Sequence, residues 1–133
     1  MKRVADQGVA LVEFAIVVPL LLIMVFGAMD VGRLYFEQVA LADAAQEGAF
    51  YSSFEPDDHT KTTTRVVESL NDPAVTAADV TVLCPGGARI IVSVEKEVQH
   101  LSPFFTPFWG SSTTLRRTVE GEVHSTATCD PTP

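Results

Sequence analysis

The longest apolar stretch of the chain runs from Val9 to Met29, and it constrains the fold more than any other feature. Its 21 residues carry one charged side chain, Glu13. Because an α-helix rises about 1.5 Å per residue, the stretch would form a helix ~30 Å long, close to the thickness of a bilayer core. We therefore predict a membrane-spanning helix at about residues 9–29, with the rest of the chain attached to its end.

The charges beside this stretch predict its orientation. Lys2 and Arg3 precede it, which places the short N-terminus in the cytoplasm and the C-terminal part outside the bacterial inner membrane. An ordinary secretory signal is disfavoured, because the apolar run is too long and Gly27–Met29 is a poor cleavage site. The residues that follow the stretch are acidic, namely Asp30, Glu37, Asp43 and Glu47.

Glu13 is unusual because a carboxylate inside an apolar membrane segment is costly. One interpretation is that it reaches the headgroups at the cytoplasmic border. The other depends on its spacing: Glu13 is the fifth residue after Gly8, which closes a short basic leader, and Phe14 follows. Gly8, four apolar residues and Glu13–Phe14 resemble the processing site of type IV prepilins.

A longer segment, from Gly8 to Tyr51, resembles the N-terminal region of TadE-like minor pseudopilins of the tight-adherence (Flp-type) pilus. Asp30 departs from the glutamate more common in that family, but it keeps the charge. The matching elements are Val12-Glu13-Phe14, Pro19 before a leucine run, Gly32-Arg33, Glu47-Gly48-Ala49 and Tyr51.

The resemblance implies that a prepilin peptidase cleaves between Gly8 and Val9. Glu13, with Phe14 beside it, would then act in assembly by pairing with the new amine of a neighbouring subunit. It also implies a pilin-like fold, a setting in adhesion and biofilm formation, and a final place in the inner membrane or an extracellular pilus. The implied partners are other pilins or minor pseudopilins and the inner-membrane assembly platform. The alternative is a permanently anchored scaffold or binding subunit of the same machinery.

The net charge of −8 argues against nucleic-acid binding, which needs a basic face. The sequence has no nucleophile–base set and no phosphate-binding glycine loop, so we expect a structural protein without cofactor or metal and not an enzyme. Asp57-Asp58-His59 has two interpretations, a metal site or an acidic turn that caps the next helix, and we favour the cap.

The remaining pattern predicts an α+β architecture. The N-terminal helix continues to about residue 52, and Ala40, Ala44 and Gly48 form a stripe of small residues that favours close packing, on the chain's own domain or on a neighbour. Residues 53–133 would form a small extracytoplasmic domain of one short helix and three antiparallel strands. These elements are expected at residues 60–70, 80–84, 90–98 and 115–127, with Ile90, Val92, Val94 and Val98 on the buried face.

Cys84 and Cys129 are the two cysteines, and both lie in the part expected to be translocated. That compartment permits disulfides, and strand alternation places both on the core side. We favour a structural disulfide, worth about 4 kcal/mol by loop entropy, over two free thiols.

An aromatic segment separates the second and third strands. Its prolines argue against regular structure. Its side chains either form a patch for a partner or the membrane surface, or fold back to cover the sheet. The residues are Phe104, Phe105, Phe108 and Trp109.

Overall fold

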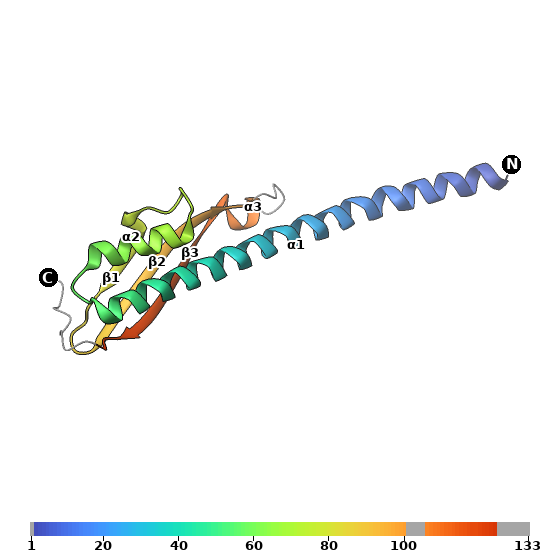
Figure 1. Ribbon diagram of the computed structural model, residues 1–133. Helices are drawn as coiled ribbons and strands as arrows, with labels where there is room; N and C mark the ends of the chain where they lie inside the picture. The colour runs from blue at the N-terminus through green and yellow to red at the C-terminus, as the bar shows by residue number, and fades with distance from the viewer. Residues whose placement is uncertain (1, 101–105, 125–133) are drawn as a thin grey trace.

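The computed structural model describes residues 2–100 and 106–124, without the side chains of residues 2–7, 108 and 109. It confirms the α+β architecture: a long helix, a short helix and a three-stranded antiparallel sheet (Figure 1). The elements are α1 (Lys2–Phe54), α2 (His59–Leu70), the 3-10 turn η1 (Ala77–Asp79), β1 (Val80–Leu83), β2 (Arg89–Gln99), α3 (Thr106–Trp109) and β3 (Ser112–Glu122).

Helix α1 projects far beyond the rest of the molecule (Figure 1). None of residues 8–29 is buried, and the helix is long and apolar enough to cross a membrane. It begins at Lys2 and not near Val9, because the polar leader consists largely of good helix formers and contains no proline. Pro19 lies within α1 and does not end it.

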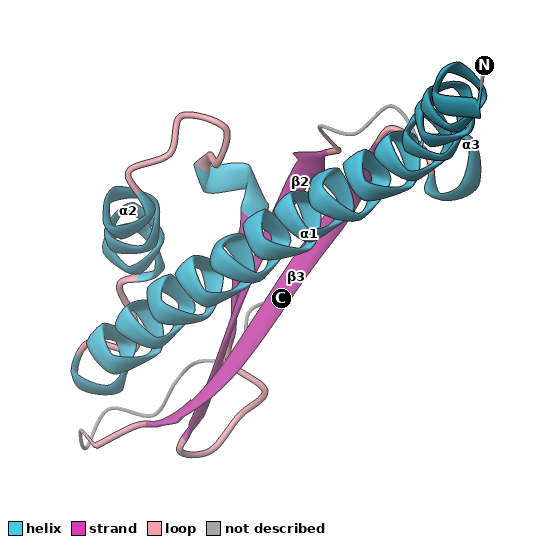
Figure 2. Ribbon diagram, turned by 90° about the vertical axis from the view of Figure 1, so that its right-hand side faces the viewer, coloured by secondary structure: helices cyan, strands magenta, loops and turns pink. Residues whose placement is uncertain are grey.

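The second half of α1 and the helix α2 cover one face of the sheet (Figure 2). The strands are ordered β1-β2-β3, with Val80 opposite Val94 and Val92 opposite Val119. The predicted alternation along β2 is confirmed, because Ile90, Val92, Val94 and Val98 are all buried.

Gly48 lies where α1 packs closely against the domain. A Cβ atom at this position would lie 2.4 Å from Cγ2 of Val66 in α2 and 3.3 Å from Cγ1 of Val92 in β2. The small-residue stripe therefore serves the chain's own packing at Ala44 and Gly48, which are buried, whereas Ala40 is exposed.

The segment before α2 is a helix cap. The carboxylate of Asp58 accepts a hydrogen bond of 2.9 Å from the backbone N–H of Lys61 and forms an ion pair of 2.8 Å with its side chain. This confirms the capping interpretation of Asp57–His59. At the other end Asn71 has a φ of 47°, the left-handed conformation that commonly ends helices.

Two features of the C-terminal part differ from expectation. Residues 106–109 form one helical turn, α3, although the prolines argued against regular structure. Pro107 is tolerated because the first turn of a helix has no use for its missing N–H. The third strand begins at Ser112 and ends at Glu122, whereas we expected it to run from residue 115 to 127.

Candidate functional site

The predicted processing and assembly residues lie on the exposed N-terminal half of α1. Gly8, Val9, Val12 and Glu13 line one shallow groove along the helix. Val9 and Glu13 are four residues apart, so they occupy neighbouring positions on adjacent turns. Phe14 follows on the next side of the helix and is exposed. The expected cleavage point therefore lies little more than one helical turn from Glu13.

An ion cluster around the buried Lys96 joins α1 to the sheet, and the sequence pattern did not predict it. Lys96 lies on the buried face of β2, and its side chain is only 8% exposed. Its Nζ donates hydrogen bonds to Oε2 of Glu37 in α1 and, at 2.6 Å, to Oδ2 of Asp72 in the segment after α2. One side chain thus connects three elements. The available signal was a lysine at the one polar position in the buried alternation of β2.

The charges of this cluster stabilise each other. The hydrogen bond from Lys96 and a further one from the backbone N–H of Ala74 hold the pKa of the Asp72 carboxyl below its ordinary value. Burial lowers the pKa of Lys96, but hydrogen bonds to Asp72 and Glu37 outweigh burial and leave the pKa raised. The cluster therefore keeps its ion pairs across the neutral pH range.

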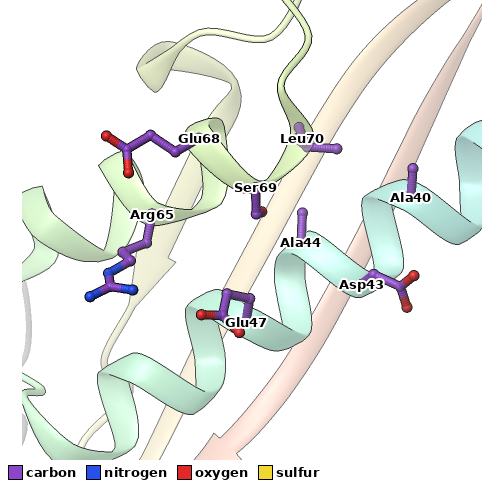
Figure 3. Close-up of a pocket in the computed structure, with 8 residues that line it drawn as sticks. All are labelled: Ala40, Asp43, Ala44, Glu47, Arg65, Glu68, Ser69 and Leu70. Carbon is purple, nitrogen blue, oxygen red and sulfur yellow. The ribbon is translucent and has the colours of Figure 1, made fainter.

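A groove with several acidic side chains lies between α1 and α2 (Figure 3). Asp43 and Glu47 border it from α1, and Glu68 borders it from α2. None of these three carboxylates has an ion pair with the described residues. Arg65, on the same groove, lies with its guanidinium carbon 5.1 Å from the centroid of the Tyr51 ring.

Comparison with known proteins assigns the N-terminal region. Residues 8–49 match the family model described as "TadE-like protein". The match covers about a third of the chain, and this N-terminal region is TadE-like. The family implies involvement in the Tad pilus system, and the apolar part of α1 indicates membrane anchoring there. No curated protein and no solved structure matches the chain significantly.

The TadE-like region contains the α1 side of several contacts with the domain, whereas those of Tyr51, Ser52 and Phe54 lie just beyond it. It includes Gly8 and Glu13, the ion-cluster residue Glu37, and Gly48, which packs closely against α2 and β2. The partners of those contacts, Lys96 and Val66, lie beyond the match. The family resemblance therefore identifies the anchoring helix, while the domain that packs on it has to be described from the structure.

The remaining predicted sites are only partly described. Cys84 is buried beside Ile90, and the described residues include no free thiol. Cys129 lies outside the described residues, so the Cys84–Cys129 pairing stays a prediction. Phe104 and Phe105 also lie outside them, and α3 is described at Phe108 and Trp109 without their side chains. The proposed aromatic patch therefore stays a prediction too.

Proposed function

We propose that this chain is a minor pseudopilin that a prepilin peptidase processes after Gly8 and that takes part in assembling a tight-adherence pilus. The observation that carries the proposal is the division of α1. The segment from Gly8 to Met29 is apolar and uncovered, with Glu13 as its single charge, whereas the part of α1 beyond Asp30 is packed onto a folded domain. Such a helix can pass from the bilayer into contact with other apolar helices while the domain remains outside.

Glu13 has a physical role in this function. Cleavage leaves a charged α-amine on Val9 in an apolar environment, where an unpaired charge is costly. Glu13 of an adjacent subunit provides the opposite charge and so sets the axial position of one subunit relative to the next. The role is structural and non-catalytic, with the N-terminus in the cytoplasm, the domain outside the inner membrane, and other pilins and the assembly platform as partners.

Processing is tested by the intact mass of the membrane-extracted, non-reduced protein from cells with and without the prepilin peptidase. We expect a chain that begins at Val9 only when the peptidase is present. A chain that begins at Met1 in both strains would contradict the proposal and leave a permanently anchored scaffold subunit. The same spectrum reports the disulfide, because a Cys84–Cys129 bond lowers the mass by two hydrogens.

Assembly is tested with Glu13→Gln, which keeps the shape of the side chain and removes its charge. We expect cleavage to continue and the amount of the protein in sheared pili to fall at least tenfold. Glu120→Gln, an exposed position on β3, serves as the control and should be incorporated like the natural chain. Wild-type incorporation of Glu13→Gln would show that Glu13 has no assembly role.

A further inference from the structure

The connection between β2 and β3 combines an aromatic pair with a lack of acidic residues. Its helical turn α3 contains Phe108 and Trp109, and Trp109 is the only tryptophan of the chain. No Asp or Glu lies between Glu97 and Glu120, although the net charge of the chain is −8. Pro107, in the first turn of α3, is exposed. The function proposed above gives this segment no role.

The sheet places this connection at the end of the domain that faces the apolar segment of α1. Near the start of β2, Val92 lies against Gly48 of α1. Just past the end of β2, His100 lines the same cavity as Arg33 of α1, so β2 runs back along the helix toward its N-terminus. Accordingly, α3 lies at the end of the domain nearest to the N-terminal half of α1 (Figures 1 and 2).

The base of the connection is held by paired backbone. Gln99 is opposite Ser112 in the β2–β3 register, and the N–H of His100 donates a hydrogen bond of 3.0 Å to the carbonyl oxygen of Ser111. A second hydrogen bond, of 2.9 Å, joins Nε2 of His100 to Oγ1 of Thr113. The strands are therefore paired up to the base of the connection, and the sheet determines the direction in which α3 projects.

The end of the apolar segment sets the level of the membrane border on α1. Arg33 lies four residues past Met29, or ~6 Å along the helix, which is the headgroup layer of a bilayer whose hydrocarbon core ends near Met29. Tyr35 follows and is 64% exposed, and tyrosine and tryptophan are enriched at this level of a membrane. Because His100 is beside Arg33 and α3 lies further toward the apolar segment, α3 is at the headgroup layer too.

The chemistry of α3 fits phospholipid headgroups. An indole ring has an apolar body and one N–H donor, which suits the boundary between hydrocarbon and water. The lack of carboxylates avoids repulsion by anionic headgroups. The opposite end of the domain, at the loop after α1, is acidic and carries Glu55, Asp57 and Asp58. The end that faces the bilayer is thus the one whose side chains suit it.

We propose that α3 is a second membrane contact of this protein and binds the headgroup layer of the bilayer that α1 spans. The domain is then attached at two points, and the tilt of the sheet relative to the membrane is fixed. The inference goes beyond the proposed function. It rests on α1 spanning the bilayer, and it holds equally for a pilus subunit and for a permanently anchored one.

The single tryptophan provides the test. The full, uncut chain is reconstituted into vesicles of phosphatidylcholine and phosphatidylglycerol, and in one sample the phosphatidylcholine carries bromine on its acyl chains near the glycerol. We expect brominated lipid to quench at least half of the emission of Trp109, because indole rings gather at this depth. Iodide, present on both sides of the membrane, should quench it weakly.

The control moves the tryptophan to the far end of the sheet in the double variant Trp109→Phe, Leu83→Trp. Leu83 is 45% exposed and lies at the level of Gly48, ~28 Å past Met29 along α1. Its emission should respond to iodide and not to brominated lipid. Quenching of Trp109 by iodide alone, by neither agent, or by lipid at both positions would each overturn the inference, since α3 would be in water, covered by protein, or no closer to the membrane than β1.

A charge on α3 should weaken the contact. In Phe108→Glu we expect the lipid quenching of Trp109 to fall at least about twofold, because a carboxylate is costly to bring into the membrane. Thr81→Glu, at an exposed position of β1, is the matched control and should leave the quenching as it is in the natural chain. Full lipid quenching in Phe108→Glu would overturn the inference.

Failure of this inference is distinguishable from failure of the proposed function, because the fluorescence measurement needs neither the peptidase nor a pilus. A chain that is processed and assembled but shows no lipid quenching loses the second membrane contact and keeps the pseudopilin role. A chain that is never cut but shows the quenching does the reverse.

Discussion

The two halves of α1 are one continuous helix in two different surroundings. From Gly8 to Met29 no residue is buried, whereas beyond Asp30 one face of the helix packs against α2 and the sheet. The first half is apolar on every side, as a lipid- or helix-embedded segment requires. The second half uses small residues such as Ala44 and Gly48 on its buried face. The comparison indicates that the domain is held on the helix by contacts beyond the apolar segment.

The largest effect on this comparison is expected from Lys96→Met. The substitution leaves Glu37 and Asp72 without their shared partner, and we expect a loss of about 2–4 kcal/mol in the free energy of unfolding, less than for fully buried charges because both carboxylates are partly exposed. Urea unfolding of the full chain in a mild detergent, followed by circular dichroism, measures this loss.

Lys61→Met is the control. Lys61 also pairs with two carboxylates, but it is 64% exposed, so solvent screens the pairs and the loss should be much smaller than for Lys96→Met. Equal losses in the two variants would contradict the expectation that the buried Lys96 contributes more to stability than the exposed Lys61.

Gly48→Ala should have the next largest effect. Alanine favours a helix, but its Cβ would meet Val66, whose branched side chain has little freedom to move, so we expect destabilisation of about 1–3 kcal/mol. Gly32→Ala on the same helix, where nothing lies within 4 Å, should be neutral or stabilise by up to about 1 kcal/mol. The same unfolding assay compares them. Val66→Ala should lessen the destabilisation that Gly48→Ala causes, because the smaller side chain makes room for the new Cβ. If the two effects simply add, α1 and α2 move apart without loss of stability, and close packing at Gly48 is unimportant.

The ion cluster also predicts a pH dependence for the domain. The folded-state pKa of Asp72 is below its ordinary value of 3.8, so its stabilisation is present above that pH and is lost as the pH falls further. Lys96 has a raised folded-state pKa, so its contribution is present below 10.5 and is lost as the pH rises through the folded-state value. The free energy of unfolding should be measured between pH 2 and 7, about once per pH unit. As the pH is lowered, it should fall less steeply in Lys96→Met than in the natural chain. The same decrease in unfolding free energy with falling pH in both proteins would show that the pairing with Lys96 does not lower the pKa of Asp72.

The smallest effect on stability is expected from Glu13→Gln. Glu13 lies in the uncovered half of α1, so the free energy of unfolding of the domain should change by no more than about 0.5 kcal/mol, although incorporation into pili falls. Both are measured on the same preparation. A stability loss comparable to that of Gly48→Ala would mean that the two halves of α1 are energetically coupled, and the comparison would fail.

Local periodicity was sufficient to predict most of the secondary structure. The runs around Val66 in α2 and around Val92 and Val94 in β2 have the spacing of helix and strand, and each has the predicted face buried. The one-turn helix α3 was not predicted, because the argument from its prolines ignored that the first turn of a helix accepts Pro107. Element ends differed by several residues, since they depend on contacts and not on period.

The sequence alone determined the apolar anchor, the spacing from Gly8 to Glu13 and the alternation of the strands, because each depends on neighbours in the chain. Only the tertiary structure decided which contacts hold the domain on α1. Lys96 binds carboxylates 59 and 24 residues away, and no local pattern names such partners.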